Sequence, residues 1–375
     1  MTSIKQPKAL VTGATGFIGG ALAAALLDQG WQVNLVVRPQ SRHKLSSAIQ
    51  GHCASGQVQV FEADLADPWV LVTSHLRIAA ASCEAVFHAA AIRDRWGASL
   101  EDYRQTNIEG TRRLLQAALG GARRFIYVSS VGVFGQPGML HIDETFPLLS
   151  CTTGTARSGQ AAYHCTKAEA ERLVHAARAE IEAVVVRPTI TYGPGDQDGM
   201  LTRLIELLAR GSLASRVRIG RGDNHLQLTY IDDLISGLLQ AGTHADAPGQ
   251  TFILAGPASI QAGQLINLIE KRLGCPAPVL CLPEGLVRPA ALGVELLYRA
   301  GEALRLPLPP AGPPLTRAKI NTLCAQRSFS SGKAARLLGY RPQVDTPEGL
   351  ERTLAWLVSS GRLATVRLAS SVERI

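Results

Sequence analysis

The chain is poor in aromatic side chains, which make up 5% of its 375 residues, and it contains no block of like charge. Its 38 Lys and Arg outnumber its 30 Asp and Glu, so the formal net charge is +8, but the basic residues are scattered. Because there is neither a basic patch nor a set of aromatic platforms for stacking, we expect no nucleic-acid partner. A membrane span is not expected either, since no apolar run reaches the roughly 18 residues that such a helix needs.

The cysteines form no CxxC pair and no spacing typical of metal ligands, so no metal site is expected. The first eight residues are short and polar and do not resemble a targeting signal. An odd number of cysteines without such a signal favours reduced thiols, and we expect a cytoplasmic protein. The seven cysteines are Cys53, Cys83, Cys151, Cys165, Cys275, Cys281 and Cys324.

Apolar residues are plentiful, at 46%, and charged residues make up 18%. That balance is typical of a globular enzyme with a full core. The length allows one large α/β domain or two of moderate size.

A glycine-rich turn lies between two apolar β runs near the N-terminus. Residues 8–12 and 32–37 have the pattern of strands, and an Ala/Leu-rich helix is expected to end near residue 29. Gly13, Gly16 and Gly19 give the turn the spacing GxxGxxG. Strand, glycine turn, helix and strand in this order predict a dinucleotide site, with the pyrophosphate at the helix N-terminus. A tight turn without a ligand is the competing interpretation.

The end of the second β run indicates which cofactor binds. An Asp or Glu there would bind the ribose 2′-hydroxyl of NAD(H), but the run ends in Val37 and Arg38. A guanidinium favours a 2′-phosphate, so NADP(H) is preferred, with NAD(H) as the alternative. Stacking of Arg38 on the adenine would explain the same residue without a phosphate.

Small and polar residues end four further β runs. In open α/β sheets, ligands bind outside the carboxyl ends of the strands, so these residues are expected to converge on one crevice. Asp64 could meet the adenine amino group there or could simply cap a helix. The four ends are Asp64 after the run 57–62, Ala89, Ala90 and Ala91 in 85–91, Ser129 and Ser130 in 124–130, and Pro188 in 184–188.

Tyr163 and Lys167 are four residues apart in a segment, 160–179, with a helical pattern. This spacing puts both side chains on one face, one turn apart. An ammonium beside a phenol favours the phenolate, so we expect the pKa of Tyr163 to fall from about 10 towards neutral pH. Such a phenol is a general acid/base for a carbonyl–alcohol pair. A chance pairing on a helix is the alternative.

Two further polar residues have less specific signals. Asn107 lies in a segment expected to be helical up to residue 119, where it could be a surface residue or could order a water beside the active-site lysine. His88 ends a β run, and a lone histidine in that position is more often structural than catalytic.

Together, these motifs resemble the extended short-chain dehydrogenases/reductases of the NAD-dependent epimerase/dehydratase superfamily. The resemblance implies a Rossmann-type doubly wound parallel sheet with a smaller C-terminal substrate-binding lobe. The matching segments are Thr12 to Gly19, Asp64-Leu65, His88 to Ala91, Asn107, Ser129-Ser130, Tyr163 to Lys167 and Arg187 to Thr189.

The resemblance also implies roles for individual residues. Tyr163 would be the general acid/base, and Lys167 would hold the nicotinamide ribose and lower the tyrosine pKa. Asn107 would support the lysine through water, and Ser130 would hold the substrate oxygen. Ser130 is preferred to its neighbour because it lies four residues before Phe134-Gly135, where relatives carry Tyr-Gly. The implied cofactor contacts are Gly13, Thr15, Gly16, Phe17, Ile18, Gly19, Arg38, Asp64, Leu65, Ala89, Ala90, Ala91, Ser129, Tyr163, Lys167, Pro188 and Thr189.

The second half of the chain has shorter, closely alternating elements. We expect the dinucleotide-binding domain to cover 1–190, with elements from about 226–255 returning to it, and a substrate-binding lobe to cover 191–361. Within the lobe, 217–233 has the pattern of two short strands around a turn followed by a helix capped by an Asp. The remaining residues, 362–375, are expected to form a tail without a companion element.

Three looser motifs in this half, Gly193 to Asp196, Gly220 to Asp233 and Pro313 to Trp356, resemble the 3β-hydroxysteroid dehydrogenase branch of the family. That branch includes sterol-4-carboxylate 3-dehydrogenases and 2-alkyl-3-oxoalkanoate reductases. An apolar helical stretch, 286–304, is expected to be a lid over an apolar substrate or a helix lying on a membrane surface. Relatives often pair through the helix that carries Tyr163, which implies a homodimer.

We therefore expect an NAD(P)-dependent oxidoreductase that interconverts a secondary alcohol and a ketone on an apolar small molecule of the 3β-hydroxysteroid, sterol or 2-alkyl-3-oxo acid type. One rival is a nucleotide-sugar epimerase or dehydratase with the same Ser-Tyr-Lys set. The other is a protein that binds NADP(H) without turnover. Arginines that could contact a nucleotide diphosphate in the first rival are Arg203, Arg216, Arg218 and Arg221.

Overall fold

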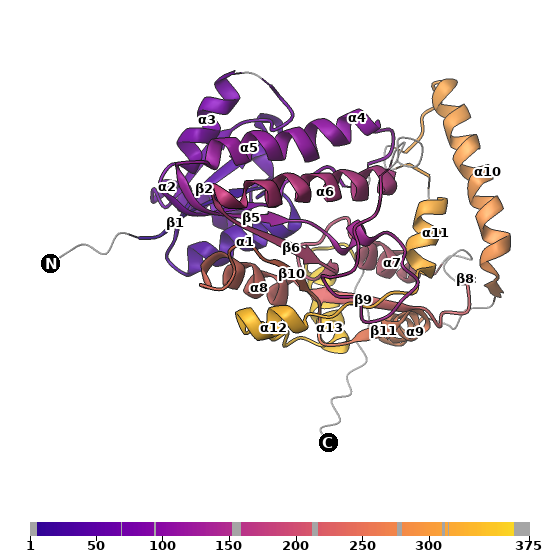
Figure 1. Cartoon of the computed structure of the whole chain (residues 1–375). Helices are drawn as coiled ribbons and strands as arrows, with labels where there is room; N and C mark the ends of the chain where they lie inside the picture. Colours follow the sequence, from indigo (N-terminus) through magenta and orange to yellow (C-terminus); the bar gives the residue numbers. More distant parts are fainter. Residues whose placement is uncertain are drawn as a thin grey trace.

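A computed structural model of the chain describes residues 6–68, 70–93, 95–151, 159–211, 217–275, 280–309, 312–313 and 315–363 (Figure 1). Arg216 and most of the expected tail, from 364 on, lie outside these residues. The first two tail residues pack on the body of the protein, because Arg362 donates to Glu206 at 2.9 Å and to the carbonyl of Gln197 at 2.8 Å.

A seven-stranded parallel sheet forms the centre of the molecule, in the order β10-β6-β5-β4-β1-β2-β3. This is a Rossmann-type doubly wound sheet, as the sequence predicts. Its order reverses between β1 and β4, where ligands of such sheets bind. The strands are β1 (Lys8–Thr12), β2 (Gln32–Val37), β3 (Val58–Glu62), β4 (Cys83–His88), β5 (Ala122–Val128), β6 (Glu182–Pro188) and β10 (Thr251–Leu254).

Helices cover both faces of this sheet, and successive strand residues alternate between the two cores. Leu10 packs with α3, α5 and α6, whereas Ala9 and Val11 pack with α1 and α8. Because both faces are buried, the strands are almost continuously apolar. The helices of these layers are α1 (Phe17–Asp28), α2 (Ser47–Ala54), α3 (Val70–Ala80), α5 (Gly110–Ala118), α6 (Gly159–Ala176) and α8 (Ile231–Thr243).

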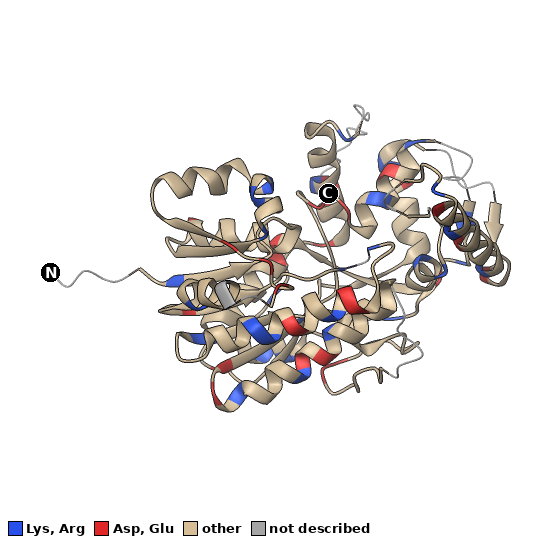
Figure 2. Cartoon of the chain, turned by 90° about the horizontal axis from the view of Figure 1, so that it is seen from above, with Lys and Arg blue, Asp and Glu red and all other residues tan. Residues whose placement is uncertain are grey.

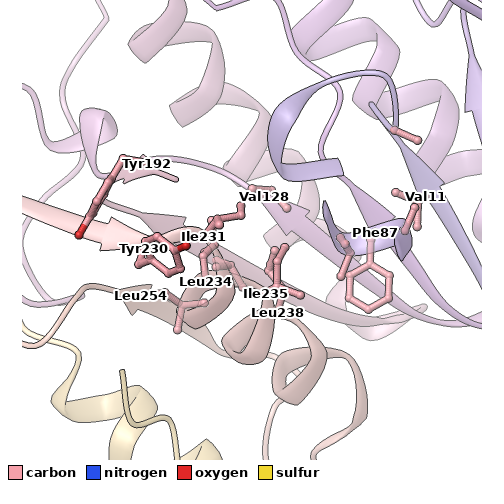
Figure 3. Close-up of a cluster of buried hydrophobic side chains, with 14 of the residues drawn as sticks. Val11, Phe87, Val128, Tyr192, Tyr230, Ile231, Leu234, Ile235, Leu238 and Leu254 are labelled. Carbon is pink, nitrogen blue, oxygen red and sulfur yellow. The ribbon is translucent and has the colours of Figure 1, made fainter. Parts of the chain in front are cut away.

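The packing of α8 shows how the second half of the chain is joined to the sheet. Leu234, Ile235 and Leu238 of α8 lie against the sheet face that carries Val128 and Phe87 (Figure 3). Strand β10 follows α8 and pairs with β6 as the edge strand. Elements from the second half thus complete the main sheet, and the boundary proposed at residue 190 stays a prediction.

Short irregular helices connect several of these elements. A π-helical segment separates α4 from α5, and it contains Asn107. The segments are the 3₁₀ helices Pro39–Lys44, Val131–Phe134 and Ala177–Ala179, helix α4 (Leu100–Tyr103) and the π-helix Arg104–Glu109.

Two small sheets lie beyond the carboxyl ends of the main strands, in the orders β11-β9-β7 and β12-β8. The two strands expected in 217–233 are present as β8 and β9, but they pair with other strands and not with each other. The elements of this region are β7 (Ile190–Tyr192), α7 (Met200–Ala209), β8 (Val217–Ile219), β9 (His225–Tyr230), β11 (Ser259–Gln261), α9 (Ala262–Leu273), β12 (Leu280–Leu282), α10 (Glu284–Ala303), α11 (Arg317–Cys324), α12 (Gly332–Leu338) and α13 (Thr346–Ser359).

The expected aspartate cap of the helix after β9 is wrong. The N-cap of α8 is Tyr230, without a side-chain hydrogen bond, and the two aspartates follow in the first turn. Asp233 instead accepts hydrogen bonds from the backbone N–H groups of Gln343, at 2.7 Å, and Val344, at 3.0 Å. Its carboxylate thus holds a segment more than a hundred residues later in the chain.

The expectation that all cysteines are reduced is also wrong for one pair. Cys151 and Cys165 form a disulfide, with a Cα–Cα distance of 5.6 Å. The loop that ends at Cys151 returns to α6, and the sequence separation of 14 residues gives no sign of this contact. Basic and acidic residues are interspersed along the helices (Figure 2). Among the described residues, no helix is long and apolar enough to cross a membrane.

Candidate active site

The glycine turn after β1 is packed too closely for side chains. A Cβ on Gly13, whose φ is +77°, would lie 2.8 Å from the backbone nitrogen of Ala90. A Cβ on Gly19 would lie 2.3 Å from the carbonyl oxygen of Gly13. The turn therefore brings β1, the start of α1 and the exit of β4 together. Since α1 begins at Phe17 without a side-chain cap, its first N–H groups can serve an anion, which fits a dinucleotide pyrophosphate.

A buried hydrogen-bond chain fixes the exit of β4. Thr12 Oγ1 lies 2.8 Å from His88 Nδ1 and accepts from the backbone nitrogen of Ala90 at 3.1 Å. His88 Nε2 lies 2.9 Å from Thr111 Oγ1. Burial lowers the pKa of His88 to about 3, so the ring is neutral at physiological pH. His88 thus positions the alanine segment together with Thr12, and Thr111 is a supporting residue that lies outside the sequence motifs.

Asn107 connects the same exit to the helix that carries Tyr163. Its Oδ1 accepts from the backbone nitrogen of Ile92 at 2.8 Å, and its Nδ2 donates to the carbonyl of Ile92 and to Thr166 Oγ1, both at 3.0 Å. The side chain is buried and makes these three bonds at once. Its support of Lys167 through water stays a prediction, whereas its bridge to α6 is direct.

Lys167 is buried beneath the ends of the strands. Its Nζ donates to the carbonyl of Val128 at 2.5 Å and lies 4.1 Å from the centre of the Tyr127 ring. Burial lowers the pKa of Lys167 to about 7, and the charge of Glu171, one turn further along α6, opposes this shift. The lysine is therefore close to the balance between its charged and neutral forms at neutral pH.

The expected lowering of the Tyr163 pKa is wrong for the chain by itself. Burial raises the pKa of Tyr163, while the charge of Arg93 and a hydrogen bond with Ser130 lower it by less. Lys167 directs its ammonium to Val128 and is not among these causes. The phenol is consequently protonated at neutral pH, as a general acid must be.

The two serines after β5 face different neighbours. Ser130 forms its hydrogen bond with Tyr163, and its Oγ also accepts from the backbone nitrogen of Gly132 at 3.1 Å. Ser129 donates to Glu171, which also forms a buried ion pair of 2.7 Å with Arg187. This geometry favours Ser130 as the serine beside the reacting oxygen. Because the hydroxyl of Ser129 donates to Glu171, its cofactor role stays a prediction.

The residues expected around the adenosine lie at the ends of β2 and β3. Arg38 is exposed directly after β2, and the neighbouring Arg42 pairs with Glu62 at 2.6 Å. Asp64 Oδ1 accepts from the backbone nitrogen of Ala66 at 3.0 Å, so it shapes a local turn. Leu65 is buried. These contacts leave Arg38 accessible, and its selection of a phosphate stays a prediction.

At the other side of the crevice, β6 ends in Pro188, which pairs with Leu254 of β10. The next residue, Thr189, is buried and its hydroxyl lies 2.6 Å from that of Thr229. Ser129 is hydrogen-bonded to the neighbouring strand through Val186 at 2.7 Å. The structure thus places the predicted strand-end residues along one edge of one sheet.

Arg93 is the charged neighbour of Tyr163 that the motifs did not reveal. It follows the alanine segment after β4, is exposed, and donates to the carbonyl of Asp198 at 3.3 Å. Its charge lowers the pKa of both Tyr163 and Asp196, against burial. Only its position after a strand end could have identified it, because nothing in the sequence shows which strand end faces Tyr163.

The comparisons with known proteins agree with this geometry. The model of the NAD dependent epimerase/dehydratase family matches residues 9–255. A 2-alkyl-3-oxoalkanoate reductase from Stenotrophomonas maltophilia is 31% identical over 361 residues, which cover 93% of this chain and 98% of that protein. A 3 beta-hydroxysteroid dehydrogenase/Delta 5→4-isomerase from Mycobacterium tuberculosis is 30% identical, with coverage of 94% and 90%.

Solved structures share the fold over almost the whole chain. The crystal structure of gox2253 has a TM-score of 0.72 and 26% identity, and it covers 96% of this chain and all of its own. The UDP-glucuronic acid 4-epimerase from Bacillus cereus in complex with NAD has a TM-score of 0.70 and 24% identity, with coverage of 94% and 99%. The chain belongs to the NAD dependent epimerase/dehydratase family and is an NAD(P)-dependent oxidoreductase of the extended short-chain dehydrogenase/reductase type.

Proposed function

We propose that the protein interconverts a secondary alcohol and a ketone on an apolar substrate, with Tyr163 as the general acid/base. The observation that carries this proposal is the position of Tyr163 beside Ser130 at the carboxyl ends of the strands, with Lys167 one turn along the same helix and bonded to the carbonyl of Val128. Two of the relatives at 30% identity or above, by their names, reduce 2-alkyl-3-oxoalkanoates or oxidise 3β-hydroxysteroids.

The close-packed glycine turn fits the cofactor of the family. Its N–H groups would hold the pyrophosphate, Arg38 would select the 2′-phosphate of NADP(H), and Lys167 would hold the nicotinamide ribose. The nicotinamide, when bound, supplies the hydride chemistry. The residues expected to line it are Ala89, Ala90, Ala91, Pro188 and Thr189.

The protein's own part is the movement of one proton. In reduction, Ser130 holds the carbonyl oxygen and Tyr163 donates its phenolic proton to that oxygen. In oxidation, the phenolate takes the hydroxyl proton. The charge of Arg93 favours the phenolate, which lowers the free energy needed to deprotonate Tyr163.

A nucleotide-sugar epimerase finds less support in the lobe. Three of the four arginines considered for a diphosphate are already paired within it, and Arg216 lies outside the described residues: Arg203 pairs with Asp198, Arg218 with Asn267 and Glu270, and Arg221 with Asp223. A protein that binds NADP(H) without turnover would need no general acid/base such as Tyr163 beside Ser130.

The test is a spectrophotometric assay of the purified chain. NADP⁺ and NAD⁺ are offered with 3β-hydroxysteroids, and NADPH with 2-alkyl-3-oxo acids and simple ketones. We expect turnover with an apolar substrate and at least about a 100-fold lower kcat for Tyr163→Phe, the size of a lost general acid/base. Conversion of a UDP-sugar without net change of cofactor, and none of an apolar substrate, would replace this proposal by the epimerase.

A further inference from the structure

Helix α10 carries a row of leucines that the described part of the chain leaves uncovered. These side chains are all more than a third exposed. They are Leu286 at 67%, Leu292 at 37%, Leu296 at 57%, Leu297 at 75% and Leu304 at 73%, continued by Leu306 at 54% just after the helix. Isolated exposed leucines are ordinary, but a contiguous row marks an interaction surface.

The geometry of the helix gathers these leucines on one side. With about 3.6 residues per turn, spacings of 11 and 7 place Leu286, Leu297 and Leu304 almost in line. The opposite side, with Val287 and Ala291, is buried against α11. Figure 1 shows α10 at the edge of the molecule, outside α11. We call the exposed side, from Leu286 to Leu304, the leucine face.

The charged residues of α10 lie at the borders of this face or behind it. Glu284 pairs with Arg288, and Glu302 accepts from the indole nitrogen of Trp96 at 2.7 Å. Glu295 is buried and pairs with Arg317 at 3.0 Å, while Arg299 lies 5.9 Å from the Trp96 ring centre. Between these charged borders, the middle of the leucine face contains only Leu, Ala, Gly and Pro.

The dimensions of the leucine face favour a lipid surface over a second copy of the chain as its partner. The 20-residue helix is about 30 Å long and about 10 Å wide, which by itself is too narrow for the roughly 800 Å² per partner of a stable protein interface. Insertion into a bilayer surface requires no minimum contact area, because each apolar side chain that enters the acyl chains adds its own favourable free energy of transfer. Exposed Arg288, Arg299 and Arg305, at the borders and end of the face, suit lipid phosphates.

We propose that α10 is a membrane-contact helix that lies on a bilayer surface with its leucine face among the acyl chains. The helix adjoins the loop that leaves β4, since the Trp96 ring packs edge-on against Tyr298 of α10 at 5.5 Å. An apolar substrate dissolved in the bilayer would thus reach the protein beside the exit of β4. This last step rests on the proposed function, whereas the binding itself does not.

Flotation of the full chain with vesicles tests the contact. The vesicles consist of phosphatidylcholine alone or of phosphatidylcholine mixed with phosphatidylglycerol. The test variant is Leu297→Glu/Leu304→Glu, and the matched control is Ile78→Glu/Leu207→Glu, which adds the same charges at exposed apolar sites of α3 and α7. We expect the wild type and the control to float with the mixed vesicles. The test variant should show about a tenfold or larger loss of the bound fraction.

Light scattering after gel filtration and circular dichroism accompany the flotation. They show whether the variants keep their fold and their number of copies. Flotation of the test variant equal to the control, or absence of the wild type from both kinds of vesicle, would overturn the proposal. A change from dimer to monomer in the test variant would do so as well, because it would make the face a protein interface. A failure of the alcohol–ketone assay would leave the flotation result intact.

Discussion

Glu171 is a buried carboxylate one turn beyond Lys167 on α6, and its removal tests how the active site is held together. It accepts from Arg187 Nη2 at 2.7 Å and from the hydroxyl of Ser129, so it joins α6 to the ends of β5 and β6. The Glu171 side chain has no exposed surface, and that of Arg187 is 5% exposed. Glu171→Gln keeps the size of the side chain and removes its charge.

The expected loss in the free energy of unfolding follows from the burial of the pair between Glu171 and Arg187. Arg187 would keep its charge without a counter-ion, and breaking one side of a buried pair costs about 3–5 kcal/mol in the free energy of unfolding. A matched exposed pair is Glu348 with Arg352 on α13, where the side chains are 49% and 46% exposed. Glu348→Gln should cost under about 0.5 kcal/mol. Urea unfolding followed by circular dichroism measures both values.

Glu171→Gln should also change the pH dependence of activity. The charge of Glu171 opposes the fall of the Lys167 pKa that burial causes. Without that charge the pKa of Lys167 falls below about 7, so less of the ammonium is present at neutral pH. Because the ammonium is proposed to hold the nicotinamide ribose, activity at neutral pH should decrease, and the limb assigned to Lys167 should move to lower pH. Profiles of kcat between weakly acidic and alkaline pH show this shift.

Two results would refute this reasoning. An unfolding midpoint for Glu171→Gln no lower than that of Glu348→Gln would mean that the buried pair does not carry the stability assigned to it. The double variant Glu171→Gln/Arg187→Met removes the stranded charge, and it should recover part of the lost free energy. A double variant that is less stable than Glu171→Gln alone would assign the loss to packing instead.

Three other substitutions each have an expected effect and a comparison in which that effect should be absent. Arg93→Gln should raise the pKa of Tyr163 and move the rise of the oxidation rate to higher pH, while Arg95→Gln should not. Arg38→Ser should raise the KM for NADPH about tenfold or more, the size of a lost charged hydrogen bond, and leave the KM for NADH nearly unchanged. Gly19→Ala should lower the Tm and weaken dinucleotide binding measured by calorimetry, because its Cβ would meet the Gly13 carbonyl at 2.3 Å, whereas a Cβ at Gly51 would meet open space.

The parts of the fold that depend on local patterns were predictable from the sequence. The runs 8–12 and 32–37 coincide with β1 and β2, because strands buried on both faces are apolar along their whole length. The segment expected to be helical around Tyr163 corresponds to α6, Gly159–Ala176. The glycine spacing located the turn, and the structure shows why it must be free of side chains.

The parts that depend on distant partners were not predictable. The turn between β8 and β9 suggested that these two strands pair with each other. Strand β8 pairs instead with β12, more than sixty residues later. Asp233 looked like a helix cap but binds the backbone at Gln343 and Val344. In each case, the sequence indicated the element or the residue type but not the distant segment that it contacts.

The spacing that revealed the catalytic pair could have revealed the charge behind it. Tyr163, Lys167 and Glu171 follow one another at intervals of four, so they lie along one face of α6. Tyr163 bonds to Ser130 at the crevice, Lys167 reaches the end of β5, and Glu171 pairs with Arg187 of β6. A helix that presents a phenol, an ammonium and a carboxylate in this order connects the reacting group to the ends of β5 and β6. Glu171, one turn beyond the pair Tyr163 and Lys167, therefore connects this recognisable motif to the stability of the site.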